Sequence, residues 1–509
     1  MKRYYGEGAI SVFLSLICVL FFSLLCTAVE SARIEGCRAK AASALDMGMF
    51  SVMGEFERAL LERYDVFFLD GAAGSGSFSQ EKLSQTLQEY MEYNVSPNKE
   101  LLIRQSDFFR LDMTSAEITG TTHATDEKGA AFYQQAVAFM HENLGTEFIS
   151  AWLERMKDGN RLENAGELYT NSDKTVSQSL QQMEEAQKQL EEQKKAELPE
   201  GEIPPETEAL PAIPESQNPL SVVRRLKKEG IFGLVLKDKS VISQKKLSSS
   251  VPSKRTNQSG NLPVEKKYSG LTADLLFQQY LFERFSLFTD SEKNGVLDYE
   301  LEYILCGKSS DESNLKSVVT RLLLLREGAN FLYLSSDAAN MEAASALAAL
   351  LVGAVPIPGL VTVTAYALLL AWAYAESLLD VRELLAGGRV PVLKSASTWR
   401  LALTSIPGLW QILEQTDGSC KEGLSYDAYL QILFTLGSSG KYPMRALDLI
   451  EGYMNSRPAT AAFRADHAIC KIQAEADFTI PPLFLRVPAA FLKAGTTTTA
   501  YHASGSFAY

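Results

Sequence analysis

The sequence has 509 residues, of which 46% are hydrophobic, and it carries a formal net charge of −13. This length allows two to four domains with packed cores. The acidic balance argues against a nucleic-acid partner, because phosphate binding needs clustered lysine and arginine. Six scattered cysteines are too few for a disulfide scaffold, and they form no CxxC pair for thiolate ligation of a metal.

An apolar run over residues 9–29 follows a short head, residues 1–8, which carries Lys2 and Arg3. The run contains no ionised side chain and is long enough to cross a bilayer as one helix of roughly 30 Å. A cleavable signal peptide is the competing interpretation, but residues 30–35 continue in good helix formers. We predict a retained anchor with a cytoplasmic head, so that the bulk of the chain is extracytoplasmic.

Four hydroxyl side chains interrupt the apolar run at spacings that are multiples of four, namely Ser11, Ser15, Ser23 and Thr27. At about 100° per residue they slant along one side of a helix. Small residues in this position let a second helix approach closely and exchange hydrogen bonds. We interpret them as a packing stripe for other membrane proteins, while the alternative is that membrane helices simply tolerate scattered serine and threonine.

A helical periodicity continues beyond the apolar run. Apolar or small residues recur at steps of three and four: Ile34, Cys37, Ala41, Leu45, Gly48, Val52, Phe56 and Leu60. This spacing predicts that the helix continues without a break to Tyr64 and Asp65, within a region over residues 30–190 that is mostly helical. Residues 191–265 are rich in Pro, Glu, Ser and Lys, which predicts a disordered connector.

Residues 266–465 are predicted to form a second helical domain that contains an apolar hairpin over residues 343–375. Pro356, Pro358 and Gly359 interrupt the hairpin and leave two halves that are short for a bilayer. We therefore favour a buried or membrane-apposed hairpin. A second membrane crossing is the alternative, because four basic residues follow the hairpin: Arg382, Arg389, Lys394 and Arg400.

The last segment, residues 466–509, changes character and is β-prone. Here apolar residues alternate with polar ones, as Ile472, Ala474, Ala476 and Phe478 against Lys471, Gln473, Glu475 and Asp477. Such alternation is typical of a half-exposed strand. The predicted fold class is mainly α with a small C-terminal β element.

No combination of residues predicts catalysis, a cofactor or a metal, so we do not expect an enzyme. Residues 290–295 begin like a calcium loop, but Leu301 stands where the closing glutamate is needed. Residues 437–441 suggest a phosphate loop, yet the first glycine is misplaced and Tyr442 replaces the magnesium-binding hydroxyl. Both segments are interpreted as turns.

Glu376 and Asp380 lie one helical turn apart at the end of the apolar hairpin. Buried together, they would form an acidic pair, and intramembrane carboxylates often mark a polar path. Arg382 and the nearby helix end offer a structural explanation instead.

Several stretches resemble a bacterial family of uncharacterised membrane proteins that is associated with Flp-type (Tad) pilus systems. They are residues 6–13 (GEGAISVF), 30–33 (ESAR), 60–70 (LLERYDVFFLD), 297–305 (LDYELEYIL) and 371–382 (AWAYAESLLDVR). The first seventy residues are also similar to the TadE and TadG pseudopilins. One departure is Phe13, which stands where a prepilin cleaved at Gly8 carries glutamate, so the resemblance does not extend to prepilin processing.

This resemblance implies a non-enzymatic, membrane-anchored accessory or pseudopilin-like component of a pilus or secretion apparatus. Its expected partners are the lipid bilayer and other membrane or pilus-assembly proteins, contacted through the N-terminal helix. The alternative function is a two-span membrane sensor or transport-associated protein with a cytoplasmic C-terminal region. In that case Glu376 or Asp380 would face a polar path.

Overall fold

The computed structural model describes residues 7–95, 108–144, 147–196, 214–353, 357–486, 489, 495 and 497–509. The chain divides into two compact units. Unit 1 comprises residues 1–139, 250–268 and 450–509, and unit 2 comprises residues 140–249 and 269–449. The first six residues of the predicted head, residues 197–213 of the predicted connector and Pro356 of the hairpin lie outside the described residues.

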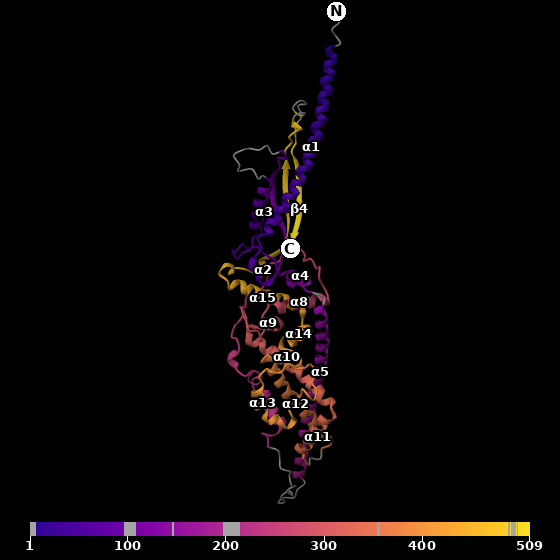
Figure 1. Ribbon diagram of the computed structural model, residues 1–509, viewed down its shortest axis with the longest axis vertical. Helices are drawn as coiled ribbons and strands as arrows, with labels where there is room; N and C mark the ends of the chain where they lie inside the picture. The colour runs from indigo at the N-terminus through magenta and orange to yellow at the C-terminus, as the bar shows by residue number, and fades with distance from the viewer. Residues whose placement is uncertain are drawn as a thin grey trace, which may run out of the picture. The chain divides into compact units, whose positions relative to one another are not determined.

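Unit 1 combines helices with an antiparallel sheet (Figure 1). Its helices are α1 (Glu7–Met53), α2 (Arg58–Tyr64), α3 (Gln80–Val95), η2 (Pro252–Lys254), η5 (Pro458–Thr460) and η6 (Ala465–His467), with parts of α4 (Asp126–Asn143) and α15 (Tyr442–Asn455). Its strands are β1 (Leu69–Asp70), β2 (Asp112–His123), β3 (Ala468–Ile480) and β4 (Thr499–Ala508).

Strand β3 lies at the centre of the sheet. It pairs with β2 along one edge, and with β1 and then β4 along the other, always antiparallel. The alternation predicted from residue 471 to residue 478 is confirmed, because Ile472, Ala474, Ala476 and Phe478 are buried. The C-terminal β element of the predicted fold class is therefore present.

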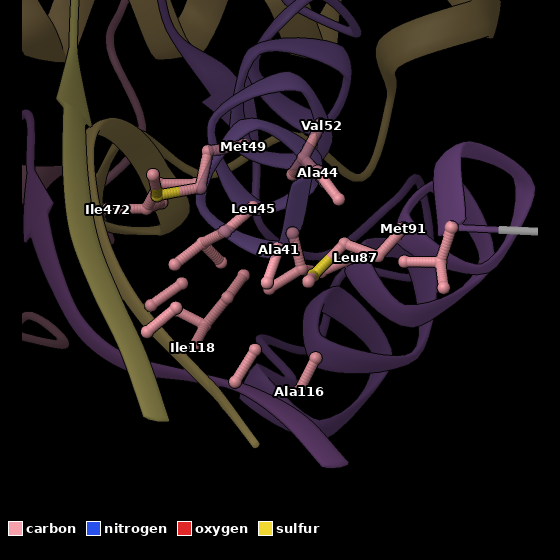
Figure 2. Packing of buried hydrophobic residues seen from close by; sticks show 14 of the residues in the cluster. Ala41, Ala44, Leu45, Met49, Val52, Leu87, Met91, Ala116, Ile118 and Ile472 are labelled. Carbon is pink, nitrogen blue, oxygen red and sulfur yellow. The ribbon is translucent and has the colours of Figure 1, made fainter. Parts of the chain in front are cut away.

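The second half of α1 packs on this sheet. In Figure 2, Ala41 and Leu45 of α1 face Leu87 of α3, with Ile118 of β2 and Ile472 of β3 in the same apolar cluster. The approach of α1 to α3 is close, since a Cβ atom on Gly48 would lie 2.6 Å from the Met91 side chain. The helical face predicted from residue 37 to residue 52 is thus the face that forms the core.

The predicted unbroken helix to residue 65 is wrong at its end. Helix α1 stops at Met53, and Gly54 follows, with its N–H donating to the carbonyl oxygen of Phe50 (2.8 Å). Glu57 then caps α2 by accepting from the N–H of Ala59 (3.3 Å). Glycine has a low helix propensity, and a side-chain cap starts a new helix beyond it.

Residues 30–190 are mostly helical, as predicted, but they also contain strand β2, which the sequence did not predict. Its residues Ala116 and Ile118 are buried, α3 packs against the strand, and the strand pairs with β3 from Asp112 to His123. Threonine recurs along β2 and favours extended structure, but the apolar side chains are too few for a clear two-residue period. Pairing with β3 decides the conformation.

Unit 2 is helical among its described residues. Its elements are α5 (Glu147–Ala196), α6 (Pro219–Lys228), α7 (Ile231–Val235), η1 (Lys239–Val241), α8 (Leu271–Arg284), α9 (Glu300–Cys306), α10 (Asp311–Ser336), α11 (Ala338–Val352), α12 (Leu360–Leu385), η3 (Leu403–Gly408), α13 (Leu409–Gln415), α14 (Tyr426–Leu436) and η4 (Ser439–Lys441). Helices α10 and α12 pack together at its centre, and α5 and α11 pack against them.

The described part of the predicted disordered connector is ordered. Helices α6 and α7 pack against α12 and bury Val222, Leu226 and Leu234. The average composition of this region is polar, but these apolar residues lie on one side of each helix, and tertiary packing supplies the order. Residues 250–268 belong to unit 1, where Asn261 accepts a hydrogen bond from the N–H of Thr121 (2.9 Å).

The apolar hairpin consists of α11 and α12. Most of the apolar part of α12 is buried inside unit 2, whereas α11 leaves one side exposed, including Leu350. Among the described residues, two helices are long and apolar enough to cross a membrane, Ile10–Met53 and Leu360–Leu385. The apolar residues of the first are exposed up to Leu25.

Candidate functional site

Three carboxylates lie on one side of α12, at Glu376, Asp380 and Glu383. The spacing of four and three residues places them on adjacent turns of the helix. All three are buried, and Glu376 and Asp380 are fully inaccessible to solvent. The two acidic residues singled out in the sequence therefore belong to a larger buried acidic row.

Three cations face this row, and we refer to the six charged side chains together as the buried ionic network. Lys394 binds both Glu376 and Asp380, with 2.6 Å between its Nζ atom and Oδ1 of Asp380. Arg326 of α10 reaches the other oxygen of Asp380 (3.0 Å), and Arg400 contacts Asp380 at 2.9 Å. Charge is balanced within the network, three against three.

Neutral groups complete the hydrogen bonding of the network. Asn330 donates to Asp380 (3.0 Å) and to the hydroxyl of Ser377 (2.9 Å). The N–H of Leu401 donates to Glu376 (2.9 Å), and Arg326 donates to the hydroxyl of Tyr429 (2.9 Å). A buried ion pair is tolerated only where such partners satisfy its remaining polar atoms.

The electrostatics favour the charged form of Asp380. Burial raises the pKa of Asp380, but Lys394, Arg326 and Arg400 outweigh it and hold that pKa well below its usual range. Burial also raises the pKa of Tyr429 to about 12, so its hydroxyl stays protonated. This arrangement cross-links α10, α12 and the segment after α12.

Arg382 was the cation expected to explain the acidic pair, and the structure corrects this. Its guanidinium donates to the carbonyl oxygen of Leu234 (3.3 Å). The cations that pair with the acidic row come from Arg326, Lys394 and Arg400. Lys394 and Arg400, two of the four basic residues interpreted as a flanking charge bias, therefore form ion pairs inside unit 2.

The predicted packing stripe, Ser11, Ser15, Ser23 and Thr27, lies on the uncovered N-terminal half of α1, and we call it the hydroxyl stripe. Ser11 and Ser15 are exposed and donate to the carbonyl oxygens of Gly8 and Val12 (3.0 Å each). Thr27 donates to the carbonyl oxygen of Ser23 (2.8 Å), and Ser23 is half-buried. Each of these oxygens retains a lone pair that can accept from a neighbouring helix.

A cleft of about 770 Å³ opens on unit 2 beside residues 437–441, the segment that suggested a phosphate loop. Arg321, Lys441 and Arg445 line it, together with Glu163 and Glu167 of α5. Its other lining residues are Gly166, Thr170, Asn171, Leu305, Cys306, Leu324, Leu325, Leu433, Leu436, Gly437, Ser438 and Tyr442. The charges of both signs suit a polar ligand, but no triad of nucleophile and base is assembled here.

Cys306 is the nucleophile candidate in this cleft. Burial raises the pKa of its thiol to about 11, so it is neutral at physiological pH. A neutral thiol is a weak nucleophile and a poor metal ligand.

The calcium-like segment does not assemble carboxylates around a cavity. The Nζ atom of Lys293 donates to the carbonyl oxygen of Phe288 (2.9 Å), and Lys245 forms an ion pair with Asp298 (2.8 Å). Across the described parts of both units, no group of three or more His, Cys, Asp or Glu residues is placed to hold a metal ion.

The fold and these features define a mainly α protein with a small antiparallel sheet and a long apolar N-terminal helix. The chain belongs to the family of unknown function DUF5702, whose model matches residues 212–480. No curated protein matches the chain, and no solved structure does.

Proposed function

We propose that this protein is a non-enzymatic, membrane-anchored component of a Flp/Tad-type pilus or secretion apparatus, either accessory or pseudopilin-like. Both folded units would lie outside the cytoplasm. The observation that carries this proposal is the division of α1 into two halves. Apolar side chains are exposed up to residue 25, whereas one face of the helix from Cys37 to Met53 packs into the core of unit 1.

The first half of α1 supports an anchor because its apolar surface is continuous. Phe13, Leu20, Phe22 and Leu24 each expose more than half of their surface. Soluble monomers rarely expose contiguous apolar patches larger than a few hundred Å². A signal sequence near the N terminus can also be long and apolar enough to cross a membrane, but here the helix continues into the core of unit 1, which favours retention.

The resemblance to pseudopilins supports a particular class of partner for the N-terminal helix. An uncovered apolar helix that extends beyond unit 1 can pack laterally against helices of other membrane proteins. The side of α1 that carries the hydroxyl stripe would face the partner helix, because small residues let two helices approach closely. The partners proposed here are therefore membrane or pilus-assembly proteins that contact the side of α1 carrying Ser11 and Ser15.

Site-specific photo-crosslinking in cells of the native host tests this contact. A photoreactive side chain at position 15 should form adducts with other membrane proteins, and Ser11→Leu should reduce them. Position 13 is the matched control, because it lies about 200° around the helix from position 11. Equal adducts from positions 13 and 15, or no effect of Ser11→Leu, would contradict a directed contact.

The two-span sensor or transporter is the second candidate function, and it requires α12 to cross the bilayer. The burial of most of α12 and the balanced ionic network support a helix inside a folded unit instead. A polar path would need Glu376 or Asp380 to face water, whereas both are inaccessible.

Labelling of intact cells with a membrane-impermeant maleimide separates the two candidates. Cys420 is exposed and follows α12, so a variant that keeps Cys420 alone reports on unit 2. Ser43→Cys in a cysteine-free background reports on unit 1, because Cys37 is buried. We expect both to label. Labelling at position 43 without labelling at Cys420 would favour the two-span protein.

A further inference from the structure

Two loops of unit 1 contact one side of α1 where the helix leaves the sheet. One loop contributes Phe108 and Phe109, just before β2, and the other contributes Leu483 and Phe484, just after β3. We call these four residues the collar. They meet α1 at Glu30 and Arg33, directly after the apolar run ends.

A buried ion pair fastens the collar to the helix. Arg33 binds Glu30 on the preceding turn (2.5 Å), and both side chains are almost fully buried. Arg33 also donates to the carbonyl oxygens of Phe109 (2.5 Å) and Pro481 (2.6 Å). Glu30 accepts from the N–H groups of Phe484 (2.7 Å) and Leu483 (3.1 Å). The pair therefore reaches both loops at once.

The hydrogen bonds to Glu30 favour its charged form. Burial raises the pKa of Glu30, but the bonds from Arg33, Phe484 and Leu483 outweigh it and leave that pKa below its usual value. A charged pair with several hydrogen-bond partners holds its geometry better than a single contact. The loops are thus fixed at one level along α1.

Three of the four side chains of the collar are aromatic, and all four are only partly covered. Phe108 is 48% exposed, and its ring centroid lies 5.6 Å from that of Phe109 and 5.7 Å from that of Phe484. Arg110 and Arg486 flank the collar, and both are exposed. Phe and Leu side chains next to exposed arginines suit the boundary between acyl chains and headgroups, where the apolar groups enter the lipid and the arginines stay at the polar level.

The position of the collar follows from the helix. Each residue of α1 advances about 1.5 Å, so Arg33 lies only about 6 Å beyond Val29 along the axis. If residues 9–29 cross the hydrocarbon, Glu30 and Arg33 stand at its edge. Apolar side chains that two loops hold beside α1 at this level would then meet lipid headgroups.

We propose that the collar inserts into the outer headgroup layer of the bilayer and sets the depth at which unit 1 sits. This inference rests on the proposed retention of α1 as an anchor. The occupant is lipid, because the collar continues the exposed apolar surface of α1. Arg110 and Arg486 would lie beside the lipid phosphates.

Quenching of an added indole by brominated lipids tests the proposal. The full-length variant Phe484→Trp is reconstituted in phosphatidylcholine and phosphatidylglycerol vesicles with bromine near the top of the acyl chains. The native tryptophans belong to unit 2 and give a constant background, which the parent protein measures. We expect quenching of the added emission and a blue shift on membrane insertion.

Phe67→Trp is the matched control. Phe67 is 37% exposed, and it lies just before Leu69, which pairs with Ile469 at the opposite end of β3 from Ile480. Eleven residues of strand separate those ends by roughly 36 Å. The indole at position 67 should not be quenched. Phe108→Trp is a second collar variant, in case Phe484→Trp does not fold.

Each outcome decides a separate point. Release of the parent protein from vesicles by alkaline carbonate would overturn the anchor and the collar together. Retention without quenching at positions 484 and 108 would overturn the collar alone. A blue shift that appears only at a high protein-to-lipid ratio would assign the collar to a second copy of the chain, which also contradicts the proposal.

Discussion

Lys394 is the residue on which the buried ionic network depends most, because it binds Glu376 and Asp380 together. Removing one partner of a buried pair leaves an uncompensated charge, which typically costs about 3–5 kcal/mol. We expect Lys394→Met to lower the free energy of unfolding of unit 2 by this amount. Urea unfolding followed by tryptophan fluorescence measures it, since the tryptophans lie in unit 2.

Arg389→Met controls for the loss of a basic residue in the same segment. Arg389 is exposed, and single exposed charges contribute about 0–1 kcal/mol. A cost of Lys394→Met as small as that of Arg389→Met would mean that Arg326 and Arg400 suffice to neutralise the acidic row.

Glu302 makes the stability of unit 2 depend on pH. Burial raises its pKa to about 7, although hydrogen bonds from Tyr426 (2.7 Å) and the N–H of Phe288 (2.9 Å) act in the other direction. A carboxyl whose pKa is higher in the folded than in the unfolded state stabilises the fold when it is protonated. Its contribution is complete below about pH 4.5 and is lost as the pH rises through about 7.

The variant Glu302→Gln removes this titration while keeping an oxygen that can accept both hydrogen bonds. We expect it to stabilise unit 2 at pH 8 relative to the parent, on the order of 1–3 kcal/mol, and to lose this advantage towards pH 5. Urea unfolding at both pH values checks it. Glu312→Gln is the control because Glu312 is exposed. A constant difference between parent and Glu302→Gln at pH 5 and 8 would exclude Glu302 as the titrating group.

Among the elements, α5 and α10 cross where Gly328 faces the backbone of Ala165 and Gly166. A Cβ atom on Gly328 would lie 2.3 Å from the backbone nitrogen of Gly166. We expect Gly328→Ala to force the helices apart and to destabilise unit 2 by about 1–3 kcal/mol. Thermal unfolding monitored by circular dichroism would show the loss.

Gly166→Ala is the matched control on the other side of the same crossing. Its Cβ atom would meet the carbonyl oxygen of Leu324 at 3.7 Å, an ordinary contact. Alanine in a helix interior is favoured over glycine by about 0.5–1 kcal/mol, so this variant should be neutral or stabilising. If both variants had the same effect, the crossing would not be as close as described.

The elements also show what the sequence could and could not predict. Strand β3 was predictable because its apolar and polar residues alternate, and α1 because its core face repeats every three to four residues. Strand β2 lacks such a period, and its conformation depends on pairing with β3. Each paired residue of β2 has its partner more than 340 positions later in the sequence. Helices α6 and α7 were not predicted, because the average composition of residues 191–265 is polar and does not reveal the few apolar residues that these helices bury.

Only part of the buried ionic network could be predicted from the sequence, because some of its members meet only through tertiary packing. Glu376 and Asp380 are close in sequence, so their pairing could be considered from spacing alone. Arg326 lies 54 positions before Asp380 and meets it only through the packing of α10 on α12. Contacts of this kind are set by tertiary structure.

At the scale of the whole molecule, the two halves of α1 predict opposite effects of two truncations. Deleting residues 1–29 removes the exposed apolar run but leaves the core residues from Cys37 to Met53. We expect this truncated protein to move from the membrane pellet to the soluble fraction after ultracentrifugation. Unit 1 should remain folded, as measured by protease resistance of the sheet.

Deleting residues 1–53 also removes the side chains on which the sheet packs. Burial of one large apolar side chain contributes about 1.5–3 kcal/mol, and α1 supplies Leu45, Met49 and Val52 among others. A domain is stable by only about 5–15 kcal/mol, so unit 1 should lose its protease resistance in this variant. If the shorter deletion unfolded unit 1 equally, the first half of α1 would contribute to the core as well as to the anchor. If it left the protein in the pellet, another surface would hold the chain on the membrane.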